Sequence, residues 1–307
     1  MPTTQTVRVV YIAGYGRSGT TVLDIALGQH PKVVGSGEIA ELTRHVWSKN
    51  EYCACGQPVH DCGFWSAVLR EWRQGQPPSL MAQYEDCQKR MESFAGLAKL
   101  SSGLSGKDLA FYGRHTSHLF GAMLSQSAKT TIVDSSKLPR RAMALALIPE
   151  IDLRVIHVVR DGRGVAWSLA KAYERDVRSG LQREIRPKSV SRTALRWSMV
   201  NLETEYLSRR MGSERFMRLR YEDFVSNPAE AMRKIGDFAE LDFVDIGERL
   251  QQGETVRPSH QIAGNRLRMN ASISLAKDEA WRSMMPRGQQ AAFSRLSGWM
   301  LRRYGYL

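Results

Sequence analysis

The sequence has few cysteines and no long apolar run. Four cysteines in 307 residues are too few for a disulfide-stabilised scaffold. The longest early apolar stretch, Val9 to Ala13, suits a strand and is far shorter than the ~20 residues that cross a bilayer. Met1 to Thr6 contains no basic residue, and no signal-type apolar segment follows it. We therefore expect an unexported, cytoplasmic protein with no stable membrane anchor.

Internal repeats, low-complexity linkers and a disorder-prone composition are also missing. Hydrophobic residues make up 42% and charged residues 24% of the chain, which is enough to build a sizeable core. We interpret residues 1–307 as a single domain. Within it, residues 79–127 lack strand alternation, and their length suits a helical lid over a binding site.

Positive charge is in excess, with 44 Lys and Arg against 31 Asp and Glu, a net charge of +13. Such an excess favours nucleic acid, an acidic membrane surface, another polyanion or a phosphorylated small molecule as partner, although a basic face can also serve solubility alone. The basic residues form no tail and are not interleaved with aromatics as in a stacking platform for bases. We therefore expect no nucleic-acid partner.

An amphipathic helix is predicted over residues 189–210. Its apolar stripe, which we assign to the core, consists of Leu195, Met199, Leu202 and Tyr206. Basic residues precede or enter this helix, and they form either a solvated loop or an anion-binding rim: Arg178, Arg183, Arg186, Lys188 and Arg192.

Three short apolar segments each end in polar residues and lead into a helical pattern. Residues 7–14, 130–134 and 153–159 are the predicted strands, and the helix after the first ends before His30-Pro31. Recurrent strand–loop–helix units predict an α/β fold with a P-loop-like central parallel sheet flanked by helices. Ligands of such sheets bind at the carboxyl ends of the strands.

A glycine-rich loop, Gly14 to Thr21, follows the first strand and opens a helix. In that context backbone N–H groups and the helix N-terminus hold an oxyanion. Gly14, Gly19 and Thr21 match the Walker A pattern, but Thr20 stands in place of its lysine. The cation comes earlier, at Arg17. The loop therefore predicts an anion site that does not serve ATP.

The chain resembles the sulfotransferases that use 3′-phosphoadenosine 5′-phosphosulfate (PAPS), above all the bacterial carbohydrate-type and tyrosylprotein branches. The likeness rests on the loop and on Arg160 with Ser168 eight residues later, and it extends to Asp134-Ser-Ser-Lys137, to Leu219 through Phe224 and to His260 through Arg268. It implies PAPS as sulfuryl donor. The nucleotide-binding residues that it implies are Gly16, Arg17, Ser18, Gly19, Thr20, Thr21, Arg160, Ser168, Tyr221, Asn265 and Arg266.

The resemblance also implies a metal-free in-line transfer in which Arg17 and Lys137 neutralise the sulfonate and the leaving oxygen. Glu38, after two glycines that permit close backbone approach, is the expected general base. Two alternatives are that Glu38 merely opens the next helix and that Glu41 is the base. There are two rival functions. One is a P-loop kinase with Asp134 and Asp161 as Mg²⁺ ligands, and the other is a polyanion-binding module.

The acceptor is a hydroxyl compound, and we favour a carbohydrate or glycolipid over peptide tyrosine or a small natural product. An apolar acceptor would need an aromatic lining, and the aromatic residues available for that or for the core are Trp47, Trp65, Trp72, Phe111 and Tyr112. The sequence leaves open whether the chain forms a homodimer.

Three of the cysteines lie within ten residues, at 53, 55 and 62. With His60 they can be interpreted as a Cys₃His zinc site, but C-x-C is tighter than the usual C-x₂₋₄-C spacing. We favour a structural turn, with a disulfide as an option, and expect no metal.

Overall fold

A five-stranded parallel sheet forms the centre of the computed structural model, which describes residues 6–102, 106–171, 176, 184 and 186–307. The sheet order is β2-β3-β1-β4-β5, and all four pairings are parallel, so the carboxyl ends of the strands lie at one edge. The predicted α/β fold is confirmed. The strands are β1 (Val7–Gly14), β2 (Val33–Gly35), β3 (Thr131–Lys137), β4 (Ile151–Val159) and β5 (Phe216–Arg220).

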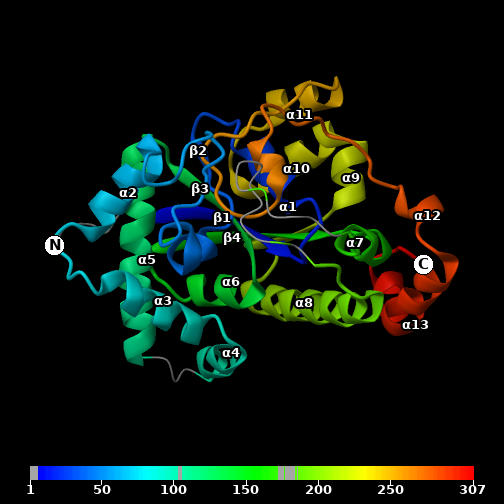
Figure 1. Cartoon of the computed structure of the whole chain (residues 1–307), viewed down its shortest axis with the longest axis horizontal. Coiled ribbons are helices and arrows are strands. Elements are labelled where there is room, and N and C mark those ends of the chain that lie inside the picture. The colour runs from blue at the N-terminus through cyan, green and yellow to red at the C-terminus, as the bar shows by residue number, and fades with distance from the viewer. Residues whose placement is uncertain (1–5, 103–105, 172–175, 177–183, 185) are drawn as a thin grey trace.

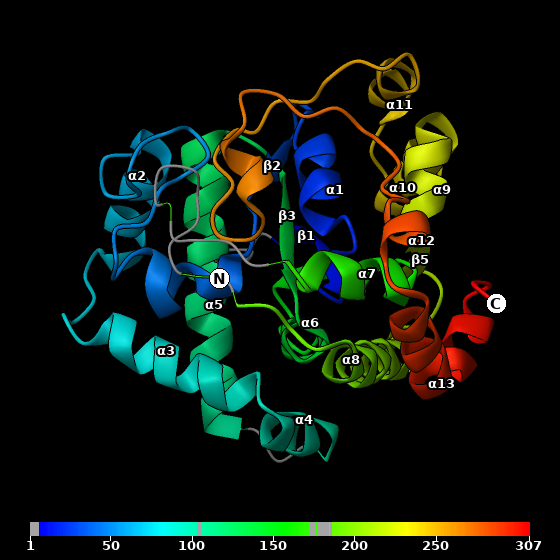
Figure 2. The same cartoon turned by 45° about the vertical axis from the view of Figure 1, so that its right-hand side comes forward.

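The central strand β1 is buried on both faces. Val9, Tyr11 and Ala13 pack into one hydrophobic cluster, whereas Val10 and Ile12 pack into another. A strand with two buried faces needs helices on both sides of its sheet, and Figures 1 and 2 show this arrangement.

Helices on the first face are α2 (Gly63–Arg73), α3 (Leu80–Met91), α5 (Gly106–Ser127), α6 (Pro139–Leu145) and the end of α8 (Val190–Met211). The second face is covered by α1 (Thr20–Leu27), α9 (Tyr221–Ser226), α10 (Pro228–Ala239) and α11 (Val244–Gln251). A third cluster joins α7 (Gly162–Leu169), α8, α12 (Trp281–Met284) and α13 (Arg287–Arg303). Helix α4 (Phe94–Ser101) contacts α6 and α3.

Local sequence signals set several helix ends. Helix α1 stops at Gly28, just before His30-Pro31. Pro228 occupies the first turn of α10, and the Asn227 side chain accepts a hydrogen bond from the Glu230 N–H. Proline lacks the N–H that a first turn leaves unpaired, and asparagine satisfies one of the others.

Residues 79–127 are mostly helical, as predicted, and form α3, α4 and α5. Helix α5 buries Tyr112, Leu119 and Phe120 in the core beside α2 and α3. This segment therefore contributes to the core, and its role as a lid stays a prediction.

The predicted buried stripe of α8 is wrong. Leu195, Met199, Leu202 and Tyr206 are exposed by 36–59%. The buried face instead combines apolar residues such as Trp197 and Leu207 with polar residues that pair across the interface. Ser198 donates to Ser297, and the side-chain oxygen of Asn201 accepts from His157 Nε2. Because both faces of α8 carry apolar residues, periodicity alone did not select the right one. Of the adjoining basic residues, Arg178 and Arg183 lie outside the described residues, and Arg186 is exposed.

Four of the five aromatic candidates for an acceptor lining belong to the core. Trp47, Trp65, Trp72 and Tyr112 are at most 1% exposed, and Trp47 stacks on Trp72. Only Phe111 is partly buried.

In the part of the chain that the structure describes, no helix combines the length and apolar character needed to cross a membrane.

Candidate active site at the carboxyl edge of the sheet

The glycine-rich loop connects β1 to α1 at the carboxyl edge of the sheet. Gly19 has φ 87° and lies against Tyr221, so that a Cβ on Gly19 would sit 2.4 Å from the tyrosine ring. Arg17 also adopts a left-handed conformation, with φ 70°. Glycine at position 19 is therefore required both by conformation and by space.

The loop offers donors for an anion. Helix α1 has no side-chain cap and no acidic residue in its first turn, which leaves its N-terminal N–H groups and dipole available. Ser18 is 1% exposed, and its hydroxyl has no hydrogen-bond partner among the described residues. A Cβ on Gly16 would meet no atom within 4 Å. An oxyanion in this loop would supply the partner that Ser18 lacks.

Arg160 follows β4 directly and joins the loop to two other segments. Its Nη1 donates to the Arg17 carbonyl over 3.0 Å, and its Nη2 lies 2.9 Å from both the carbonyl and a carboxylate oxygen of Asp278. The guanidinium lies 4.7 Å from the Tyr221 ring centroid. Asp161 pairs with Arg163 rather than with Arg160, so Arg160 contacts the loop through Nη1 and Asp278 through Nη2.

Ser168 and Tyr221 lie on the helices that follow β4 and β5. Ser168 is half-buried near the end of α7, whose first turn is capped by Asp161. Tyr221 begins α9, and its hydroxyl donates to the Ala276 carbonyl over 3.1 Å.

Glu38 contacts Lys137 at the end of β3. The backbone N–H of Glu38 donates to the Ile262 carbonyl over 3.0 Å. A Cβ on Gly264 would lie 2.7 Å from Glu38 Oε1 and 3.5 Å from Thr21 Oγ1, so the carboxylate lies close to the phosphate loop. Glu38 is the N-cap residue of a short 3₁₀ helix, Ile39–Glu41, but its side chain makes no capping hydrogen bond there.

Glu41, the alternative base, is held by other side chains. It lies 2.7 Å from His45 Nε2 and 3.4 Å from Arg44 Nη1. Burial raises the pKa of Glu41, but the hydrogen bond from His45 and the charge of Arg44 outweigh it and keep that pKa below its usual value. Hydrogen bonds to Glu41 and Glu51 raise the pKa of His45 to about 9. Glu41 is thus committed to an ion-pair cluster.

Asp134 and Asp161, the hypothetical Mg²⁺ ligands of a kinase, are both engaged. Asp134 is fully buried and accepts from Arg141 over 2.9 Å. Arg141 also binds Glu92 over 2.8 Å, and sequence reasoning missed both of these partners. Asp161 caps α7 and binds Arg163. These contacts disfavour the kinase interpretation.

Residues 256–273 return to this edge of the sheet from the C-terminal half (Figure 2). Ile262 pairs with Gly37 in a parallel bridge. Asn265 caps the short 3₁₀ helix Arg266–Met269 by accepting from the Leu267 N–H over 3.2 Å, and Arg266 is exposed. Asn265 and Arg266 thus lie in the segment that borders Glu38, although Asn265 uses its side-chain oxygen locally.

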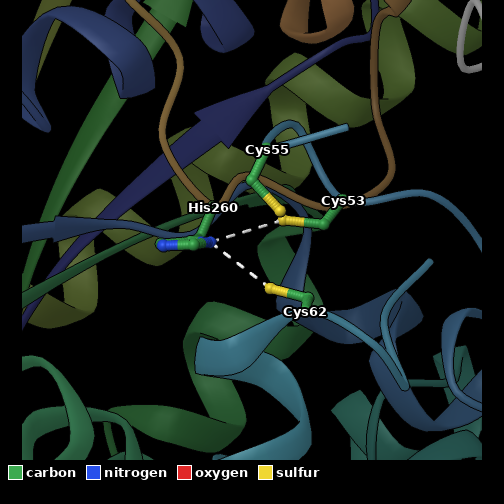
Figure 3. A group of neighbouring side chains, drawn as sticks. All are labelled: Cys53, Cys55, Cys62 and His260. Atoms are coloured by element: carbon green, nitrogen blue, oxygen red, sulfur yellow. Dashed lines mark hydrogen bonds between the residues drawn. The ribbon is translucent and has the colours of Figure 1, made fainter. Parts of the chain in front are cut away.

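The three clustered cysteines meet a histidine that the sequence did not indicate. Cys53, Cys55 and Cys62 lie with His260, and the four ligand atoms are all within 4.8 Å of one another (Figure 3). His60 is exposed and is not part of the group. All four cysteines of the chain lie in described segments and are free thiols, so the disulfide option is not realised. The partner of the turn, His260, is 198 residues beyond Cys62.

A profile of the sulfotransferase family matches residues 10–245. The chain belongs to the sulfotransferase family. The matched residues of this sulfotransferase include the phosphate loop, Glu38, Lys137, Arg160, Ser168 and Tyr221, whereas His260, Asn265 and Arg266 lie beyond them. No curated protein matches the sequence significantly.

Solved structures support the fold. The sulfotransferase domain from the curacin biosynthetic pathway is 15% identical, with a TM-score of 0.53 over 96% of this chain and 98% of that one. Sulfotransferase STF9 from Mycobacterium avium is 14% identical, with a TM-score of 0.51 over 98% and 78%. These likenesses show the fold. Membership of the family makes the protein a PAPS-dependent sulfotransferase that acts on a hydroxyl acceptor, and its branch within the family stays a prediction.

Proposed function

We propose that the nucleotide of PAPS binds between the glycine-rich loop and the Arg160–Ser168 pocket, with the acceptor hydroxyl beside Glu38. The contact among Gly19, Tyr221 and Arg160 carries this proposal. The Tyr221 ring touches Gly19 of the loop and also lies near the Arg160 guanidinium. The same ring therefore borders both the proposed 5′-phosphosulfate site and the proposed 3′-phosphate site.

The residues present suit a ligand with two separated phosphate groups. The loop N–H groups and the Ser18 hydroxyl would hold the 5′-phosphosulfate, and Arg160 with Ser168 would hold the 3′-phosphate. Arginine binds a phosphate through two parallel donors. Asp278 occupies one edge of Arg160 in the free protein and is half exposed, so it can yield to a phosphate.

PAPS supplies the sulfuryl group, and adenosine 3′,5′-bisphosphate (PAP) is the leaving product. Arg17 and Lys137 place positive charge where the transferred group and the leaving oxygen carry negative charge. Cations fixed before the reaction stabilise such a transition state without reorganising during it. No step here requires a metal ion.

Glu38 would accept the proton of the acceptor hydroxyl. Its side chain is 18% exposed, so an acceptor can reach it from solvent. In the free protein Lys137 neutralises the carboxylate. A sulfonate next to Lys137 would compete for that cation and leave Glu38 to the hydroxyl, within a hydrogen-bond distance of ~2.6–3.2 Å.

We infer a carbohydrate or glycolipid acceptor from the resemblance to the carbohydrate-type branch and from the net charge of +13, which favours anionic glycans. Peptide tyrosine and small natural products are the alternatives. The burial of Trp47, Trp65, Trp72 and Tyr112 removes four aromatic side chains from any acceptor pocket, which weakens the case for a flat apolar acceptor.

Replacing Arg160 with alanine should weaken PAP binding. The variant loses a charge-assisted, bidentate contact, and the expected cost is about 1.5–3 kcal/mol. Isothermal titration calorimetry with PAP measures it. Arg233→Ala is the matched control, because Arg233 is an exposed residue of α10 whose ion-pair partners among the described residues, Glu230 and Asp237, belong to the same helix. An unchanged dissociation constant for Arg160→Ala would remove the assignment of the 3′-phosphate pocket.

A further inference from the structure

The cysteine turn and the C-terminal segment meet in a compact group of metal-ligand atoms. His260 Nδ1 lies 3.4 Å from Cys62 Sγ and 3.6 Å from Cys53 Sγ (Figure 3). A tetrahedral zinc ion, with Zn–S of about 2.3 Å and Zn–N of about 2.0 Å, separates a sulfur from a nitrogen ligand by about 3.5 Å. The two observed distances therefore match edges of a zinc tetrahedron.

We propose that Cys53, Cys55, Cys62 and His260 bind a structural zinc ion. The four residues supply three sulfurs and one imidazole nitrogen, which is a standard ligand set for a closed structural site. The metal site stands independently of the function proposed above. It also differs from the Cys₃His grouping with His60 that the sequence suggests, because the histidine comes from a distant segment.

The turn that carries the sulfur ligands is held by backbone hydrogen bonds. The Cys53 N–H donates to the Gln57 carbonyl over 2.9 Å, the Gly56 N–H donates to the Cys53 carbonyl over 3.0 Å, and the Cys62 N–H donates to the Pro58 carbonyl over 2.8 Å. The backbone therefore holds the three sulfurs close together.

The His260 ring is held in place by the same turn. The backbone carbonyl of His260 accepts a hydrogen bond from Trp65 Nε1 over 2.7 Å. The imidazole ring stacks on Phe64, with 5.2 Å between the ring centroids. Both aromatic residues belong to the first turn of α2, directly after Cys62. Fixing the imidazole in this way presents Nδ1 to the sulfurs.

A buried cation lies near the cluster. Arg268 is 1% exposed, and its Nη2 donates to the carbonyl of Tyr52, the residue before Cys53, over 3.3 Å. Its Nε and Nη1 have no hydrogen-bond partner among the described residues. A zinc ion with three thiolates and one neutral imidazole carries a net charge of −1. Arg268 would place a positive charge near that negative charge, although it also interacts with the carboxylates of Glu51 and Glu38.

The zinc ion would fasten the segment that borders Glu38. Next to His260, the Gln261 carbonyl accepts from the Ala54 N–H over 3.0 Å, and Ile262 pairs with the backbone of Ser36 and Glu38. Loss of the metal would free residues 260–264 from the cysteine turn. The consequence for Glu38 rests on the proposed function, whereas the binding of zinc does not.

Elemental analysis of protein purified without a histidine tag, under reducing conditions, tests the proposal directly. We expect about one zinc ion per chain in the wild type, and loss of that ion in Cys62→Ser and in His260→Ala. His260→Cys should retain zinc, because a Cys₄ set is also a structural zinc site. Cys87→Ser and His60→Ala are the controls and should keep the full zinc content, since Cys87 lies outside the cluster and His60 is exposed.

Cobalt substitution supplies a second readout that needs no variant. The wild-type protein reconstituted with Co²⁺ should show intense visible bands of tetrahedral cobalt with thiolate charge-transfer bands, and added Zn²⁺ should abolish them. A zinc-free protein that binds neither ion, a disulfide among Cys53, Cys55 and Cys62, or zinc retained in His260→Ala but lost in His60→Ala would each overturn the proposal. None of these results bears on PAP binding, which calorimetry measures separately.

Discussion

Replacing Glu38 with glutamine is expected to lower kcat by 10²–10⁴-fold, the usual effect of removing a general base. Glutamine keeps the size of the side chain but cannot accept the acceptor's proton. The affinity for PAP should stay nearly unchanged, because we propose that Glu38 faces the acceptor and the Arg160 pocket holds the nucleotide. Steady-state kinetics with PAPS and calorimetry with PAP separate the two effects.

Glu41→Gln is the matched control, since it makes the same chemical change three residues later. Glu41 is partly buried and is paired with His45 and Arg44, so kcat of this variant should stay close to that of the wild type. Near-wild-type turnover of Glu38→Gln together with a large loss in Glu41→Gln would transfer the role of base to Glu41.

Replacing Arg141 with methionine is expected to lower the free energy of unfolding by about 3–5 kcal/mol, because it leaves the buried Asp134 without its cation and Glu92 with Arg44 alone. Arg141 is 1% exposed and binds Asp134 and Glu92, whose side chains are fully buried. Methionine preserves much of the volume, so the effect reports on charge rather than on a cavity. Urea unfolding followed by circular dichroism measures it.

Arg90→Met provides the comparison for that measurement. Arg90 pairs with Asp108, and both side chains are about half exposed, so this pair should contribute less than about 1 kcal/mol. If Arg141→Met and Arg90→Met lowered the free energy of unfolding equally, burial would not determine how much the Arg141 cluster contributes to stability.

Local patterns in the sequence predicted the sheet and the position of the site. The β-branched run of β1, the glycines of the loop and the helix after it lie within one strand–loop–helix unit, so neighbouring residues define it. Arg160 and Lys137 were predicted for the site because each follows a predicted strand, and parallel strands bring their carboxyl ends together; the structure places both at that edge of the sheet.

Contacts between distant segments were not predictable in the same way. His260 joins the cysteine turn only because the segment after α11 returns to the sheet, and no spacing rule connects it with Cys62. The buried face of α8 was missed because Ser198 and Asn201 find polar partners on α13 and β4, and such pairs do not show in hydrophobic periodicity. The Arg141 cluster likewise depends on three separate elements.

The most direct measurement is mass spectrometry of the products formed when the protein is incubated with PAPS and a panel of sugar, phenol and alcohol acceptors. We expect a sulfated sugar and an equal amount of PAP, with no sulfated product when ATP replaces PAPS and far slower formation by Glu38→Gln. Sulfation of a tyrosine peptide or a small alcohol in preference to every sugar would contradict the proposed acceptor class. PAPS left unconsumed with all acceptors, together with no binding of PAP, would contradict the nucleotide site itself.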